Sequence, residues 1–366
     1  MKHSALSISI FIISSILFTV SCNTTNNNTS STENKIDHII EKKIDSLLKS
    51  LHQNRKFNGN ILIAKNDQII YKNEFGFSDG YKKNILKETD RFNIGSIYKE
   101  IPAIAIMQLE EKGLLQLNDP IKKHLSYLPD WSNNIKIINL LQYTSGLPKI
   151  DWRKHKIIND QNLINDLSEI SNLEFTPGED YIYTNFSPFL LSKIVESITD
   201  TTFSSYVNQN IIKPLHLEQS TFNTSFPYKN RDSMALPFNN KFEEDKLPFI
   251  IKSPIFLFST TTNDLFQLIK NLHSGNIINK NSLLKISKTA NLDRNNMQSA
   301  LGNITYEKEK IIEHTHHGTS GNYESIISKN ELNSTTIIIL TNNKSGNIHA
   351  LRNTIIELIK TNNEVK

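Results

Sequence analysis

Two kinds of hydrophobic pattern divide this chain into regions. From about Ile36 to Leu51, apolar residues recur every three or four positions, which predicts an amphipathic helix. Two strand-like runs follow, Asn60–Ala64 and Gln68–Glu74. The polar residues 65–67 between them predict a β-hairpin.

Strand patterns return only near the other end, at Tyr323–Lys329 and Thr335–Thr341, before a helical pattern over Ile348–Ile359. Helical patterns and loops with Pro or Gly dominate from about residue 92 to 299. Strands at both ends with helices between them favour an α/β (α+β) fold. We predict one domain over residues 35–366, in which both chain ends form an antiparallel sheet flanked by helices, with an inserted helical subdomain.

Composition narrows the class of protein. Hydrophobic residues make up 37% of the 366 residues and charged residues 21%, as in an ordinary globular enzyme. The net charge of +4 is small and scattered, so nucleic acid is not an expected partner. A single cysteine excludes disulfides within the chain, and we expect no cofactor.

The first 22 residues have the pattern of an export signal: a short basic start, then a mostly apolar stretch that ends at Cys22. The segment resembles a bacterial lipoprotein signal, in which Cys22 would carry the lipid. An ordinary secretory signal with an incidental cysteine is the alternative. Residues 23–34 are rich in Asn, Thr and Ser and predict a flexible tether. We therefore expect an exported protein held by a lipid anchor in the cell envelope, in the periplasm or at the outer membrane.

Ser96 and Lys99 form a Ser-x-x-Lys motif at the start of an apolar helix. Residues three apart share a helix face, so the amine can reach the hydroxyl and take its proton. The amine must be neutral to do so, which burial favours. The same spacing recurs at Ser46–Lys49 and Ser282–Lys285, which we interpret as solvated helix faces.

Tyr183 and Asn185 form the second candidate element, where a loop enters an apolar helix. A phenol near Lys99 could shuttle the proton, and the Asn185 amide could hold a substrate carbonyl or amide. Tyr-x-Asn is common in this Asn-rich chain, and a half-buried Tyr beside a turn Asn is the plain alternative.

His316, Gly318 and Thr319 form the third element, just before the strand that begins at Tyr323. Glycine on a strand lets another main chain approach closely, and the Thr319 N–H could face a developing oxyanion. A metal site at His314, His316 and His317 is the alternative. Because Glu313 should point away from His314 and His316, and no Asp or Cys completes the set, we predict no metal.

With these elements in this order, the chain resembles the serine β-lactamase and penicillin-binding-protein family, in its class C and esterase branch. His316-x-Gly318 is similar to that family's Lys-Thr-Gly motif, with histidine in place of lysine. The segment Leu140–Pro148, which contains Thr-Ser-Gly-Leu-Pro, adds a more specific likeness.

The resemblance implies an acyl-enzyme mechanism. Ser96 would attack a carbonyl, Lys99 and Tyr183 would manage the proton, and the N–H groups of Ser96 and Thr319 would hold the oxyanion. Asn185 would contact the substrate, and His316 would stand beside Tyr183 or the substrate's carboxylate end.

A histidine is less reliably charged than lysine, which favours esters or small D-amino-acid peptides over β-lactams as substrates. A class C-like β-lactamase or a D-alanyl-D-alanine carboxypeptidase is the alternative enzyme. A non-catalytic penicillin-binding-like lipoprotein is the alternative from another class.

Overall fold

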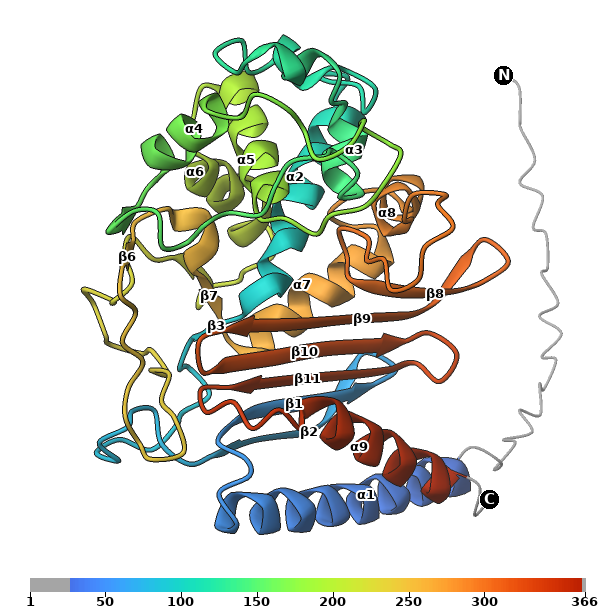
Figure 1. The fold of residues 1–366 in the computed structure, drawn as a ribbon. Coiled ribbons are helices and arrows are strands. Elements are labelled where there is room, and N and C mark those ends of the chain that lie inside the picture. The colour runs from blue at the N-terminus through green and yellow to red at the C-terminus, as the bar shows by residue number, and fades with distance from the viewer. Residues whose placement is uncertain (1–26, 364–366) are drawn as a thin grey trace, which may run out of the picture.

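A six-stranded sheet forms the central layer of the computed structural model, which describes residues 27–363 (Figure 1). The strand order is β2-β1-β11-β10-β9-β8, and every neighbouring pair is antiparallel. The strands are β1 (Gly59–Lys65), β2 (Gln68–Phe75), β8 (Asn303–Glu307), β9 (Lys310–Ser320), β10 (Tyr323–Asn330) and β11 (Thr335–Thr341).

The two ends of the chain meet in the middle of this sheet. Strand β1 pairs with β11 along its full length, from Gly59 opposite Thr341 to Lys65 opposite Thr335. The predicted sheet from both termini is therefore confirmed. The sequence did not predict β8, and it predicted a strand only at the Gly318 end of β9, because β9 carries Lys, Glu and three His where an apolar run would be expected.

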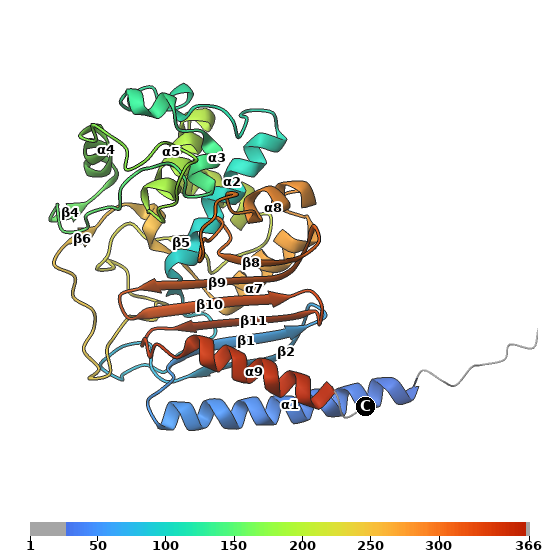
Figure 2. The ribbon, with the colours of Figure 1, turned by 45° about the vertical axis from the view of Figure 1, so that its right-hand side comes forward.

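Helices α1 (Asn27–Gln53) and α9 (Ile348–Asn363) lie along one face of the sheet (Figures 1 and 2). Ile61 and Ile63 of β1 point into the apolar cluster between these helices and the sheet. Helix α1 begins at Asn27, so residues 27–34 of the predicted tether are helical instead. Once a packed helix has formed, each added residue gains a backbone hydrogen bond at little further cost, which extends it beyond the apolar stripe.

The opposite face packs against the inserted region, with Leu62 and Ala64 of β1 in the larger apolar cluster. Period-two alternation thus sends successive β1 residues to two separate cores. The inserted helices are α2 (Glu100–Glu111), α3 (Ile137–Leu141), α4 (Asp160–Ser168), α5 (Phe186–Thr199), α6 (Phe203–Val207), α7 (Thr262–Ser274) and α8 (Lys280–Ser287). Short strands join them: β3 (Phe92–Asn93), β4 (Ile157–Ile158), β5 (Thr221–Phe222), β6 (Ile250–Ile251) and β7 (Phe258–Thr260).

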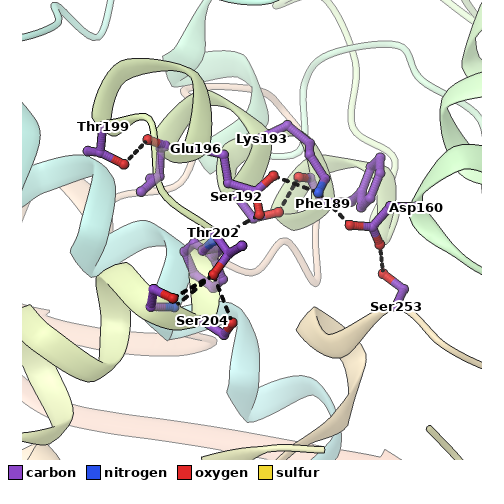
Figure 3. A network of polar contacts seen from close by, with 12 residues as sticks. Asp160, Phe189, Ser192, Lys193, Glu196, Thr199, Thr202, Ser204 and Ser253 are labelled. Atoms are coloured by element: carbon purple, nitrogen blue, oxygen red, sulfur yellow. Dashed lines mark hydrogen bonds and ion pairs between the residues drawn. The ribbon is translucent and has the colours of Figure 1, made fainter. Parts of the chain in front are cut away.

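A polar network ties the inserted helices to one another (Figure 3). Lys193 of α5 pairs with Asp160, the first residue of α4, and with Glu196 at 2.7 Å. Asp160 also accepts a hydrogen bond from Ser253 at 2.5 Å, and Glu196 accepts one from the Phe203 N–H of α6 at 2.8 Å. Lys193 and its two carboxylate partners therefore link three helices and the loop at Ser253.

Residues 1–22, with the predicted export signal and Cys22, lie outside the described part of the chain. Within residues 27–363, none of the helices has both the length and the apolar character that crossing a membrane requires.

Candidate active site

Ser96 is the one partly exposed residue in an otherwise buried segment. Every residue from Phe92 to Met107 is buried except Ser96, which is half-buried. The segment begins with β3, continues through a 3-10 helix, η1 (Gly95–Lys99), and enters α2. From the sequence, we predicted Ser96 in the first turn of an α-helix. The structure has the tighter 3-10 turn, in which side chains three apart eclipse each other.

Lys99 lies directly under this serine. Its Nζ donates a 2.9 Å hydrogen bond to Ser96 Oγ, and its side chain is almost fully buried. The rings of Tyr98 and Tyr183 each have their centroid 4.8 Å from Nζ. Burial lowers the pKa of Lys99 to about 7, so a large share of the amines is neutral near neutral pH.

The loop before α5 brings Tyr183 to the same place. Tyr183 is hydrogen-bonded to the Ser96 side chain and to Tyr143, whose ring centroid is 4.7 Å from its own. Burial raises the pKa of Tyr183 above its usual range, and these hydrogen bonds only partly oppose that. Tyr183 therefore stays a neutral phenol that can both donate and accept a hydrogen bond.

Asn185 joins the first two motifs. It occupies the N-cap of α5, but its side chain makes no capping hydrogen bond. Instead its Oδ1 accepts a hydrogen bond from the Tyr98 hydroxyl at 3.2 Å, from inside the Ser-x-x-Lys motif. The Leu140–Pro148 segment supports the loop before it: Ile182 N–H donates to Tyr143 O at 2.9 Å, and Thr184 donates to Pro148 O at 2.6 Å.

The third motif lies against the main chain of the nucleophile. Strand β8 pairs with β9 only as far as Thr315, so it leaves the edge of residues 316–320 without a partner from that strand. A Cβ on Gly318 would lie 2.0 Å from Ile94 O and 3.0 Å from Ser96 N. Only glycine permits this approach. Gly95 makes the reciprocal contact, because a Cβ there would lie 2.3 Å from Thr319 N.

The histidines of β9 divide between the two faces of the sheet. His314 and His316 are buried towards α2, whereas His317 bonds to Glu324 on the other side at 3.2 Å. Glu313 also points away and pairs with Arg352 of α9 at 3.0 Å, as the sequence predicted. His316 is 1% exposed, and burial lowers its pKa although Glu100 acts to raise it.

The structure also places two residues here that sequence reasoning missed. Glu100 Oε1 lies 2.7 Å from His316 Nδ1 and 3.1 Å from His314 Nε2. Nε2 of His273, in the last turn of α7, lies 3.0 Å from His314 Nδ1. Glu100 follows Lys99 directly, so an acidic residue inside an apolar helix was the available signal.

Glu100 also corrects the expectation that nothing completes a metal-binding set beside these histidines. Glu100, His314 and His316 have ligand atoms within 4.8 Å of one another and could hold a metal ion. The fold supplies a carboxylate from a helix far away in the sequence. The distances of 2.7 and 3.1 Å are those of direct hydrogen bonds.

The other two Ser-x-x-Lys matches do not combine a buried lysine with a partly exposed serine. Ser46 and Lys49 lie exposed on α1, as expected. Ser282 was expected in solvent but is buried, in a helix that packs against α2 and α7. Its partner Lys285 is half-exposed and pairs with Glu110 at 2.8 Å.

Comparison with known proteins agrees with this geometry. The family described as Beta-lactamase matches residues 40–359. The chain belongs to the beta-lactamase family. It is thus a β-lactamase-related serine hydrolase by family. Among curated proteins, Protein flp of Staphylococcus aureus (strain N315) is 26% identical over 331 residues, which cover 86% of this chain. They cover 64% of Protein flp, so the chain spans less than two thirds of that relative's length.

Solved structures of the beta-lactamase family share the fold. A penicillin-binding protein from Bacillus halodurans superposes with a TM-score of 0.73 at 20% identity, covering 84% of this chain and 98% of that one. The D-amino acid amidase from Ochrobactrum anthropi SV3 superposes with a TM-score of 0.71 at 18% identity. This likeness covers 89% of this chain and 99% of the amidase chain, and at such identities it establishes the fold alone.

Proposed function

We propose that this protein hydrolyses esters or small D-amino-acid peptides and amides through an acyl-enzyme formed on Ser96. The observation that carries the proposal is the 2.9 Å contact between a buried Lys99 amine and a half-exposed Ser96 hydroxyl. A neutral amine at that distance can accept the proton as Ser96 attacks a carbonyl carbon. The acyl-oxygen or acyl-nitrogen bond then breaks, and water later hydrolyses the acyl-serine.

The other residues of the site transfer the proton, stabilise the oxyanion and position the substrate. Tyr183, hydrogen-bonded to Ser96, passes the proton towards the leaving group. The N–H groups of Ser96 and Thr319 stabilise the oxyanion, which is typically worth around 3 kcal/mol for each donor. Asn185, at the N-cap of α5 where the Tyr183 loop ends, positions the substrate.

The state of His316 supports the choice of substrate class. A β-lactam carries a carboxylate that a cation would attract, but burial lowers the pKa of His316 and leaves it uncharged near neutral pH. The amidase from Ochrobactrum anthropi acts, by its name, on D-amino acid amides, and it has the same fold. Both points favour an ester or amide substrate over a β-lactam.

Covalent labelling tests the enzyme proposal. A fluorophosphonate or a penicillin should add to Ser96, and mass mapping should locate the adduct. Ser96→Ala should abolish labelling, while Ser46→Ala and Ser282→Ala should leave it unchanged. Absence of any adduct would support a non-catalytic binding lipoprotein instead, and an adduct that persists in Ser96→Ala would exclude Ser96 as the nucleophile.

A substrate panel tests the preference. Short-chain aryl esters, D-amino-acid amides, D-alanyl-D-alanine peptides and a chromogenic cephalosporin should be compared by kcat/KM. We expect esters or amides to be preferred. A preference for the cephalosporin would overturn the proposed substrate class in favour of a class C-like β-lactamase. A preference for the D-alanyl-D-alanine peptides would favour a D-alanyl-D-alanine carboxypeptidase.

We also propose that the mature protein is exported and anchored through a lipid on Cys22. Metabolic labelling with a fatty acid and membrane fractionation should detect the anchor in the native chain, and Cys22→Ser should abolish both signals. Export without lipid in the native chain would support an ordinary secretory signal.

A further inference from the structure

Five buried or half-buried side chains form one unbroken hydrogen-bonded row behind the site. It runs from His316 to Glu100 (2.7 Å), to His314 (3.1 Å), to His273 (3.0 Å) and on to Glu331 (2.9 Å). We call this row the buried relay. Its first three members are at most 1% exposed, and its far end, Glu331, is 30% exposed at the side chain.

The proton count along the relay is fixed by the chemistry of its members. An ionised carboxylate can only accept hydrogen bonds. The pKa of Glu331 is lowered by the hydrogen bond from His273, and that of Glu100 is lowered by His314 and His316 although burial raises it. Both are therefore ionised near neutral pH. His316 Nδ1, His314 Nε2 and His273 Nδ1 must then each carry a hydrogen.

One more hydrogen must lie between His314 Nδ1 and His273 Nε2. The two rings together then hold a proton more than two neutral imidazoles, so the pair carries one positive charge between two carboxylates. Burial lowers the pKa of His273, and Lys329, which lies 3.6 Å from Glu331, acts in the same direction, whereas Glu331 acts to raise it. Lys99 acts on His316 as a neighbouring cation when protonated.

We propose that Glu100 is a positioning residue that, with His314, His273 and Glu331 behind it, holds His316 as the uncharged tautomer with its hydrogen on Nδ1. The Nε2 atom of His316 then carries a lone pair and can only accept a hydrogen bond. The relay keeps this state fixed because changing it would leave a buried carboxylate or imidazole without its partner, which is costly.

The inference has a consequence for substrates that rests on the proposed function. An imidazole held as an acceptor offers no charge to a substrate carboxylate and suits a neutral or proton-donating group, such as an ester or a primary amide. The family's usual lysine at this position would do the opposite. Glu100 thus sets the substrate class through His316 without touching the substrate.

The same three residues could instead be read as a metal site, and the hydrogen-bond geometry argues against it. Tetrahedral ligands at about 2.0–2.1 Å from zinc lie farther apart than 2.7 Å, the separation of Glu100 Oε1 and His316 Nδ1.

Nitrogen-15 NMR of histidine-labelled protein tests the tautomer directly, with each ring assigned through its His→Gln variant. In the native protein we expect His316 to carry hydrogen on Nδ1 and not on Nε2, and the His314–His273 pair to carry hydrogen on three of its four nitrogens. Hydrogen on His316 Nε2, or two neutral rings in the pair, would overturn the proposal.

Two substitutions at Glu100 separate its roles. Glu100→Leu removes the acceptor, so hydrogen should move to His316 Nε2, and kcat for the preferred ester should fall at least tenfold with KM changing less. Glu100→Gln keeps an acceptor without the charge. His316 should keep its tautomer, because the amide oxygen still accepts a hydrogen bond from Nδ1.

Glu313→Gln is the matched control, because Glu313 points to Arg352 on the other side of β9 and should change neither tautomer nor kcat. A merely structural role would lower the unfolding midpoint of Glu100→Leu and leave the His316 tautomer unchanged, and that result would overturn the proposal. Stoichiometric Zn²⁺ binding that shifts the His314 and His316 signals together would do the same. The NMR readout needs no turnover, so failure of Ser96 labelling and failure of this inference are distinguishable.

Discussion

A single lysine sets both the chemistry and part of the stability of this protein. Lys99 is 3% exposed, and burial lowers its pKa to about 7. The neutral amine is the form that can accept the Ser96 proton. We therefore predict that kcat/KM rises with pH through a single ionisation near pH 7 and then levels off. A profile that is flat from pH 5 to 9 would exclude Lys99 as the base.

The burial of Lys99 also determines whether the free energy of unfolding rises or falls with pH. Below pH 7 Lys99 is charged in both the folded and the unfolded chain, so its full desolvation cost is present. Between about pH 7 and the ordinary lysine value of 10.5, the unfolded chain binds more protons, and stability rises with pH. Lys99→Met should be inactive yet more stable than the native protein at pH 6. Urea unfolding should show that advantage shrinking by up to about 1.4 kcal/mol per pH unit above pH 7.

Gly318 is the residue where the strand and the nucleophile are in closest contact. Its Cβ position lies 2.0 Å from Ile94 O, so Gly318→Ala must displace the main chain that carries Ser96. We expect kcat/KM to fall roughly 100-fold or more, the effect of misplacing a reacting group by about 1 Å. We also expect a loss of about 1–3 kcal/mol in unfolding free energy.

Gly113→Ala is the control for this substitution. Gly113 has φ of +70°, but nothing lies within 4 Å of its Cβ position. It should cost only about 1–2 kcal/mol of backbone strain and leave kcat/KM unchanged. Equal activity losses in the two variants would show that the Gly318 contact is not what positions Ser96.

At the scale of the elements, the α4–α5 contact depends on an ion pair whose lysine is largely shielded from water. Lys193 is 12% exposed at its side chain and bonds to Asp160, which also accepts from Ser253 (Figure 3). Asp160→Asn should lower the free energy of unfolding by about 1–3 kcal/mol, since hydrogen bonds to charged groups are lost. Glu357→Gln breaks the exposed pair with Lys360 and should cost less than about 0.5 kcal/mol. Equal costs in urea titrations would contradict a special role for Asp160.

Whether an element was predictable depended on how local its cause is. The hairpin β1–β2 and strands β10 and β11 follow from alternation and turn residues within a few positions, and they were predicted. Strand β9 was predicted only at its Gly318 end, because His314 and His316 are polar residues buried by a partner, Glu100, that approaches from α2. The Ser96, Tyr183 and Gly318 elements were identified by their context, and the structure brings all three together.

The contacts among those elements could not be read from the chain. The hydroxyl of Tyr98 reaches Asn185, and Tyr143 packs on Tyr183, but no short-range pattern marks either pair. Spacing within a motif reports local geometry only. The buried relay from His316 to Glu331 joins strand β9, helices α2 and α7 and the turn after β10. Contacts between such distant residues can be recognised only in the folded structure, where the sheet places β9 next to η1.

At the scale of the whole molecule, the sheet couples the site to the far end of the chain. Residues 316–320 of β9 lie against η1, and β9 is held through β10 and β11 to β1. Helix α9 covers the opposite face, where Ile355 is completely buried. The site therefore depends on a layer that contributes no residue to it.

Ile355→Ala tests this coupling. Removing a fully buried isoleucine side chain should cost about 2–5 kcal/mol, whereas Asn353→Ala on the exposed side of α9 should cost little. Because the sheet is closed by strands from both chain ends, the loss should be global. Circular dichroism and the rate of Ser96 labelling should then fall at the same, lowered urea concentration in Ile355→Ala. If Ser96 stayed reactive after the sheet had unfolded, the inserted helices would hold the site by themselves, and the coupling would be excluded.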